Sequence, residues 1–451
     1  MPQFPQPPNN KRLGLHYFPD TYHYREDDLR AWSPLIRSTG ITWLVLISPL
    51  HRAIPESFLR GLIDIGIEPV LHFYPPLVNS HINTNLELLF QTYKRWGVQY
   101  TILFDRPNIR KTWSKSEWSQ MDLVERFLDR FTPIAETAMH TGLIPVFPPL
   151  EPGGDFWDIA FLKAALVSLV RRGKNELLNQ LVLSAYARAG DRPLDWGAGG
   201  PERWPVARPY FTPPGVQDHL GFRIFDWYLA TARASTGRSL PIILLGVGSQ
   251  PSLNNWQSEE TIDETAQSLR TLTIAKRLNG EIPEPHLADP LSSIQDEVLA
   301  CNFWLMSASP ADEAAKFAWF DHAGCPTQIA VMLQQFNEAQ RDRGKSHKKV
   351  VRQLTHPQNS VRATSIAHPI AHYLLLPSFD WGVADWHLEA IQPFVKKYKP
   401  TIGFSLLEAS HAARVTVFDE YNAYQEDALE MLCEAGCIVE IMDSDGMKIA
   451  R

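Results

Sequence analysis

Short apolar runs alternate with amphipathic segments eight times between residues 13 and 320, and this alternation constrains the fold more than any other feature. Most runs end at Pro, Gly or Asp, and the segments between them have the spacing of apolar residues expected of helices. The runs lack a strict polar alternation, which is typical of strands buried on both faces of a parallel sheet. We therefore predict an α/β fold, a (β/α)₈ TIM barrel, with strands near 13–18, 43–48, 69–74, 100–105, 144–148, 181–186, 241–246 and 301–306.

The chain of 451 residues is longer than one barrel needs, so a second, smaller domain is expected. We place the barrel at residues 1–340. A polar and basic stretch follows at 341–368, which is typical of a linker or exposed connection. A second alternation of strand and helix patterns begins at residue 369 and runs to 451, and it predicts a small α/β module that binds a surface or a partner.

The charge balance excludes several classes of partner. The formal net charge is −7, and the one basic stretch has no interleaved aromatic residues, so we predict no nucleic-acid partner. The chain begins without the pattern of a secretory leader, and an apolar run of 18 residues is missing, so we predict no membrane partner and a cytoplasmic location, with export by another route left open.

Cofactor and metal motifs are also missing from the sequence. The four cysteines are scattered, and the histidines do not have the HxH or HExxH spacing of metal ligands. Neither GxGxxG, GxxxxGK[ST] nor GxSxG occurs. We therefore predict no cofactor and no metal.

The first half of the predicted barrel, from LGLHYFPDTYHY to IEPVLHFY, resembles the retaining glycoside hydrolases of the large (β/α)₈ clan that includes cellulase-like, xylosidase-like and β-galactosidase-like enzymes. The resemblance implies a general acid/base Glu in an Asn-Glu-Pro run after the fourth strand, and a nucleophilic Glu at the end of the seventh. After the fourth strand this chain has Asp105, Arg106 and Pro107, and at the end of the seventh strand it has Gly246. By that correspondence, Arg106 and Gly246 hold the positions of the two catalytic glutamates.

The retaining mechanism needs a proton-donating carboxyl group and a second carboxyl group about 5 Å away as nucleophile. A guanidinium does not give up its proton near neutral pH, and glycine has no side chain. We therefore predict a degenerate member of the clan, a pseudoenzyme without the standard retaining activity. Relocated carboxylates are the alternative, in which Asp105 works with Glu151 or Glu202 as a glycosidase acting on O-glycosyl bonds; the competing structural interpretation is that such acids form ion pairs or cap helices.

Aromatic and polar residues that follow the strands predict a cleft that binds an oligo- or polysaccharide. The long loop at 191–214 combines glycines with Trp and Arg side chains that can stack on sugars and bind hydroxyl groups. By the resemblance, Trp319 corresponds to the Trp after the eighth strand on which clan members stack a sugar ring. The expected binding residues are His16, His72, Arg106, Asn108, Trp113, Trp157, Tyr186, Arg203, Trp204, Tyr210 and Trp319.

The segment from RVTVFDEY to GMKIA resembles part of the cell-wall-binding repeats of bacterial surface proteins, which implies a protein or cell-wall partner for the C-terminal module. The sequence thus favours a bacterial, glycoside-hydrolase-like barrel that binds carbohydrate. An active hydrolase with relocated carboxylates and a protein-interaction scaffold are the two alternatives.

Overall fold

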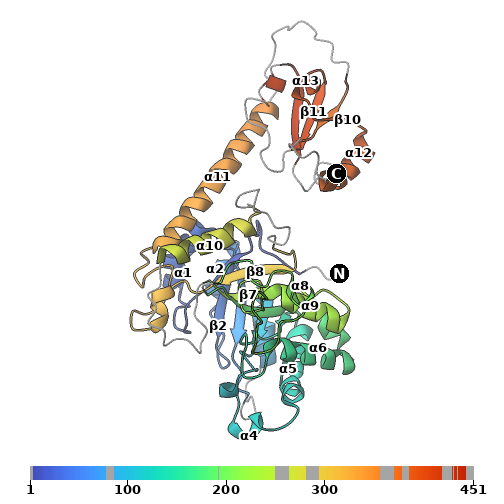
Figure 1. Cartoon of the computed structure of the whole chain (residues 1–451). Coiled ribbons are helices and arrows are strands. Elements are labelled where there is room, and N and C mark those ends of the chain that lie inside the picture. The colour runs from blue at the N-terminus through green and yellow to red at the C-terminus, as the bar shows by residue number, and fades with distance from the viewer. Residues whose placement is uncertain are drawn as a thin grey trace. The chain divides into compact units, whose positions relative to one another are not determined.

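The structure is a computed structural model of the whole chain (Figure 1). It describes residues 4–77, 86–190, 192–248, 264–280, 294–355, 370–377, 385–418, 429, 431–433 and 435–442. The chain divides into two compact units, Met1–Glu338 and Ala339–Arg451, which are described separately below.

Unit 1 is a (β/α)₈ barrel, as the sequence predicted. Its eight strands lie in the order β5-β4-β3-β2-β1-β8-β7-β6, and all neighbours pair in parallel. A parallel bridge between Val146 and Val182 joins the two outer strands, with the Phe147 amide donating to the Val182 carbonyl at 2.8 Å, and so closes the barrel. The strands are β1 (Leu13–His16), β2 (Trp43–Ser48), β3 (Glu68–Phe73), β4 (Tyr100–Leu103), β5 (Ile144–Val146), β6 (Leu183–Arg188), β7 (Ile242–Gly248) and β8 (Val298–Phe303).

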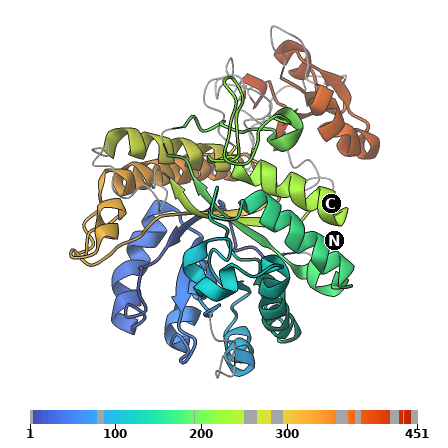
Figure 2. The same cartoon turned by 60° about the horizontal axis from the view of Figure 1, so that its bottom comes forward.

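The helices of unit 1 surround the strands (Figure 2). Each turns one apolar stripe toward the sheet, as α5 does with Phe127, Phe131, Ala135 and Ala138. The long helices are α1 (Glu26–Thr39), α2 (Glu56–Asp64), α3 (Leu86–Arg95), α5 (Leu123–His140), α6 (Asp158–Arg171), α9 (Ile224–Thr236) and α10 (Glu264–Leu278). Shorter elements are η1 (Arg110–Thr112), α4 (Lys115–Trp118), α7 (Asn175–Gln180), α8 (Gly200–Arg203) and η5 (Glu313–Phe317).

The interior of the barrel is filled by side chains that include Trp43, Tyr100 and Tyr186. At the end where the strands begin, residues of the N-terminal segment cover this interior. Phe4 packs against it, the Tyr100 hydroxyl donates to the Pro5 carbonyl at 2.5 Å, and the Trp43 indole donates to Asn10 at 2.8 Å. The described N-terminal segment therefore closes this end of the barrel, and the opposite end, where the strands finish, is the functional end of such barrels.

Unit 2 contains a small parallel sheet with the strand order β10-β9-β11-β12, in agreement with the predicted α/β module. Its elements are β9 (Tyr373–Leu375), α12 (Asp385–Tyr398), β10 (Thr401–Gly403), α13 (Leu406–Ala409), β11 (Arg414–Phe418) and β12 (Ile438–Met442). Gly403 lies against Tyr373, and a β-carbon at this position would come within 1.9 Å of the Tyr373 hydroxyl. A side chain at position 403 would therefore have to displace the buried Tyr373 ring.

Helix α11 (Gln328–Thr355) is longer than the sequence indicated. Its last part covers residues 341–355, where we expected the start of a connection without regular structure. The polar residues that suggested a linker, mainly Lys, Arg and Gln, are also good helix formers, and composition does not separate the two cases. The rest of the expected connection, up to residue 368, lies outside the described residues.

Among the described residues, no helix has both the length and the apolar composition needed to cross a membrane.

Candidate functional site

Polar and aromatic side chains gather at the end of the barrel where the strands finish. We call this set the mouth cluster; it comprises His16, His72, Asp105, Arg106, Glu151, Tyr186, Arg188 and Trp304. They come from β1, β3, β6 and the segments that follow β4, β5 and β8. Strand ends of a parallel barrel converge, so residues distant in the sequence meet there.

Asp105 is held in place by unusual backbone geometry. The residues on both sides of it, Phe104 and Arg106, have positive φ angles of 68° and 45°. Left-handed backbone at a non-glycine residue costs about 1 kcal/mol or more, and such strain is concentrated at functional sites. The Asp105 carboxylate accepts hydrogen bonds from the Tyr186 hydroxyl and from Arg106 Nε, each at 2.7 Å.

Glu151 is buried, and its two oxygens have different surroundings. Oε1 accepts a hydrogen bond from Arg188 Nη1 at 2.7 Å. Oε2 lies 3.9 Å from Arg106 Nη1 and has no hydrogen-bond partner among the described residues. The Nε of Arg188 is likewise buried without a partner. Unpaired buried polar atoms are uncommon, because each costs about 1–3 kcal/mol, and these atoms have hydrogen-bonding capacity that the described protein groups do not use.

The two arginines of the mouth cluster both lie over the ring of Tyr186, with distances to the ring centre of 5.8 Å for Arg106 and 4.5 Å for Arg188. Burial lowers the pKa of Arg106, but the neighbouring Asp105, Tyr186 and Glu151 raise it more, so the net pKa lies above its ordinary value. Burial, with the adjacent Asp105, raises the pKa of Tyr186 well above its ordinary value. Arg106 is therefore charged and Tyr186 neutral near neutral pH.

The two histidines of the mouth cluster are neutral. Burial lowers the pKa of His16 to about 3, helped by His72 and Arg188, and burial also lowers the pKa of His72. His16 Nε2 accepts the Gly246 amide at 3.1 Å. His72 Nε2 lies 2.9 Å from the Phe104 carbonyl and Nδ1 lies 3.1 Å from the Tyr74 hydroxyl, so we assign the ring proton to Nε2.

These hydrogen bonds use both nitrogens of His72 and one of His16. Within the described ranges, no three His, Cys, Asp or Glu side chains are grouped to hold a metal ion.

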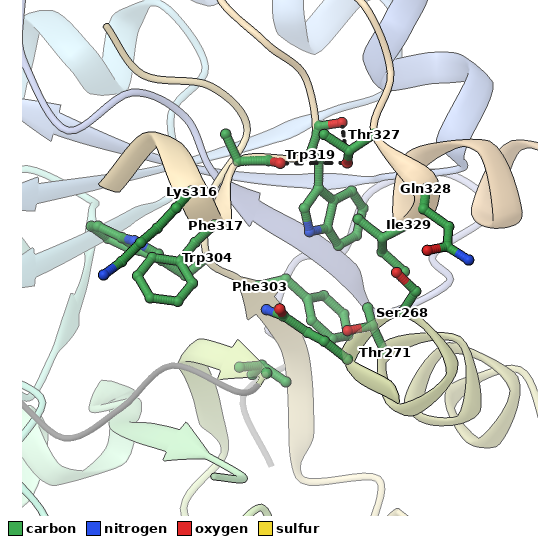
Figure 3. A pocket seen from close by; sticks show the side chains of 14 residues that line it. Ser268, Thr271, Phe303, Trp304, Lys316, Phe317, Trp319, Thr327, Gln328 and Ile329 are labelled. Carbon is green, nitrogen blue, oxygen red and sulfur yellow. Dashed lines mark hydrogen bonds between the residues drawn. The ribbon is translucent and has the colours of Figure 1, made fainter. Parts of the chain in front are cut away.

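Trp304 joins the mouth cluster to an aromatic pocket. Its ring centre is 4.8 Å from that of His16, and its indole nitrogen is buried without a partner in the described structure. On its other side lies a pocket of about 50 Å³, lined by residues of β7, α10, β8, η5 and the start of α11. In Figure 3, Trp304 and Phe317 lie on one side of this pocket and Trp319 and Ile329 on the other, with Ser268 and Thr271 near Phe303.

The structure brings six of the predicted residues together in the mouth cluster: His16, His72, Asp105, Arg106, Glu151 and Tyr186.

Asn108 and Trp113 lie beneath this surface. The buried Asn108 amide binds the Glu151 backbone at both its carbonyl and its amide, each at 2.8 Å, and so positions Glu151. Trp113 is buried, donates to the Pro107 carbonyl at 2.7 Å, and is covered by two guanidinium groups.

Residues predicted from the long loop lie on α8 and nearby. Glu202 and Arg203 are exposed, so Glu202 does not share the buried surroundings of Glu151. Trp204 donates to the Ala198 carbonyl at 3.0 Å and lies under the Arg203 guanidinium. Tyr210 is 71% exposed, and its hydroxyl reaches the Gly154 and Asp155 carbonyls.

The other two predicted tryptophans are partly or wholly covered. Trp157 is half-buried, with its ring centre 5.9 Å from that of His219. Trp319 lines the aromatic pocket, but it is buried and packs on Phe303 at 5.4 Å between ring centres.

Two members of the mouth cluster were missed by the sequence reasoning. Arg188 follows Tyr186 by two positions, and residues so spaced on a strand share a face, so this signal was present. Trp304 was assigned to the interior of the eighth strand, but β8 ends at Phe303. The indole thus lies at the strand end rather than in the sheet.

No protein-family model matches the sequence, and no curated protein matches it either. Similar folds occur among solved structures. A monomeric β-xylosidase from Caulobacter crescentus CB15 has a TM-score of 0.44 at 13% identity, covering 73% of this chain and 69% of that one. A GH39 β-xylosidase from Caulobacter crescentus has a TM-score of 0.42 at 11% identity, covering 75% and 73%.

A Bacteroidetes-affiliated GH5 cellulase has a TM-score of 0.37 at 10% identity, covering 72% of this chain and 90% of that one. Likenesses of this size do not place the chain in a family. A fold of this kind does not define a function, which depends on the residues of the site.

Proposed function

We propose that unit 1 binds carbohydrate at its mouth cluster and does not carry out the two-carboxylate retaining reaction. One observation carries this proposal. Arg106 lies between Asp105 and Glu151, while β7 ends in glycine and residues 241–258 contain neither Asp nor Glu. The described part of β7, Ile242–Gly248, therefore supplies no attacking carboxylate opposite the carboxylates after β4 and β5.

The mouth cluster has the composition of a sugar site. Sugars combine apolar faces, which pack on aromatic rings, with hydroxyl groups that both donate and accept hydrogen bonds. Trp304 supplies a partly exposed ring beside further aromatic residues of the pocket, and the unpaired polar atoms of Glu151, Arg188 and Trp304 supply acceptors and donors. The rings and polar atoms of the site therefore complement the apolar faces and hydroxyl groups of a sugar.

Hydrolysis by Asp105 and Glu151 is the second candidate, because one guanidinium brings the two carboxylates to the same place. Both carboxylates are, however, bound in ion pairs with arginines, and a general acid must deliver a proton in the transition state. The ion pairs favour binding over catalysis.

The test combines binding and turnover. Purified protein is titrated calorimetrically with cellotetraose, laminaritetraose and mannotetraose, and is assayed for hydrolysis of the same sugars and of aryl glycosides. Binding without turnover is expected, and Trp304→Ala should weaken it at least tenfold, while Trp118→Ala on α4 serves as the matched control. Turnover that Asp105→Asn abolishes would establish the hydrolase instead, and the absence of binding to every sugar would leave the scaffold alternative.

A further inference from the structure

The charges of the mouth cluster cancel, which limits the kind of sugar that it can bind. Asp105 is paired with Arg106, Glu151 is paired with Arg188, and the two histidines are neutral near neutral pH. The described residues of the mouth cluster therefore offer no uncompensated charge to a ligand. A ligand that brings a full charge into these buried surroundings would lose its hydration without gaining a partner.

The gap between Arg106 and Glu151 gives a more specific constraint. Arg106 Nη1 and Glu151 Oε2 are 3.9 Å apart, too far for a direct hydrogen bond. At this separation one oxygen atom can lie about 2.8 Å from both. That atom has to accept a hydrogen bond from the guanidinium and donate one to the carboxylate.

Only some groups satisfy both demands. A hydroxyl group donates and accepts, whereas a carboxylate only accepts and an ammonium only donates. A ligand carboxylate would therefore face Glu151 without a proton between them, and like charges at this distance repel. Water can fill the gap in the free protein, and a sugar hydroxyl can replace it with the same hydrogen bonds.

We propose that the mouth cluster selects neutral sugars over acidic and amino sugars, with one sugar hydroxyl bridging Arg106 and Glu151. This inference rests on the proposed function, since it names the class of sugar that the same site takes. The Arg106 side chain is 23% exposed and the Glu151 side chain is 4% exposed, so Arg106 is the member of this pair that faces solvent.

The experiment compares sugars that share one backbone. The neutral tetrasaccharide that binds best is compared by titration calorimetry with the same chain oxidised at C6 to the uronate, and for a glucan backbone also with the glucosamine tetramer. The wild-type protein should bind the neutral form at least tenfold more tightly than either charged form. Uronate binding equal to or tighter than neutral binding would overturn the inference.

Two variants change the charge in opposite directions. Glu151→Gln leaves an excess positive charge, so it should weaken neutral binding about tenfold and reduce or reverse the preference over the uronate. Arg106→Gln leaves an excess negative charge, so it should also weaken neutral binding but increase that preference. A residue with a merely structural role would not shift the ratio with opposite signs, and an unchanged ratio in both variants would refute the bridge.

Circular dichroism establishes that each variant is folded. If Glu151→Gln does not fold, the change in sugar preference of Arg106→Gln alone tests the bridge. Glu176→Gln, on the exposed surface of α7, is the matched control and should leave both affinities unchanged. If the wild-type protein binds no neutral sugar, the proposed function itself is wrong. If it binds neutral sugars but prefers the uronate, only the further inference is wrong.

Discussion

Replacing Arg188 by Met would isolate the contribution of charge pairing to the stability of the barrel. Arg188 Nη1 donates to Glu151 Oε1 at 2.7 Å, and the two side chains are 11% and 4% exposed. Met fills much of the volume of the arginine stem, so packing over Tyr186 is largely kept, but Glu151 loses its closest counter-charge. Removing one partner of a buried ion pair costs about 3–5 kcal/mol, because the remaining charge stays buried.

For a unit of 338 residues, an unfolding entropy of about 2.1 cal/mol/K per residue converts this loss into a Tm decrease of about 4–7 °C. Calorimetry measures the decrease in Tm, and urea denaturation measures the loss in the free energy of unfolding. The double variant Glu151→Gln with Arg188→Met removes both charges, so it should lie within about 2 kcal/mol of the wild type. If the single variant proves as stable as the double one, Glu151 is not a buried charge that depends on Arg188, and the reasoning is wrong.

Three further predictions concern other parts of the chain. Burial raises the pKa of Glu68 to about 8, so the folded state holds a proton that the unfolded state releases near its ordinary value of 4.5. Relative to Glu68→Gln, wild-type stability should fall by up to about 5 kcal/mol as the pH rises from 4.5 through 8, and then level off, as thermal unfolding at several pH values would reveal. Asn108→Ala removes the amide that binds the Glu151 backbone, so it should lower the free energy of unfolding measured in urea by about 2–3 kcal/mol and should also reduce sugar affinity. An unchanged affinity would mean that Glu151 keeps its position without Asn108. Gly403→Ala places a β-carbon 1.9 Å from the Tyr373 hydroxyl, so it should make unit 2 sensitive to limited proteolysis while the barrel stays protected. A variant whose unit 2 resists the protease as well as the wild type does would contradict the close approach.

The layout of the barrel could be predicted from the sequence. Runs such as residues 43–48, apolar on both faces and bounded by turn residues, are compatible with little besides buried parallel strands, and β2 has these bounds. The sequence also places Arg106 after the fourth strand and Gly246 on the seventh, and this part of the prediction requires only that the strands be correctly located. The local sequence pattern was sufficient to locate the strands because consecutive apolar residues indicate a strand that is buried on both faces.

The pairing of charges and the exposure of rings could not be predicted in this way. Asp105 and Glu151 are 46 positions apart, and only barrel closure shows that each carboxylate is bound by a different arginine. Trp113 and Trp304 are both tryptophans that follow a barrel strand, yet Trp113 is buried against two guanidinium groups and Trp304 lies at the mouth. Contacts of this kind depend on which strand ends converge in space, so only the tertiary structure decides them.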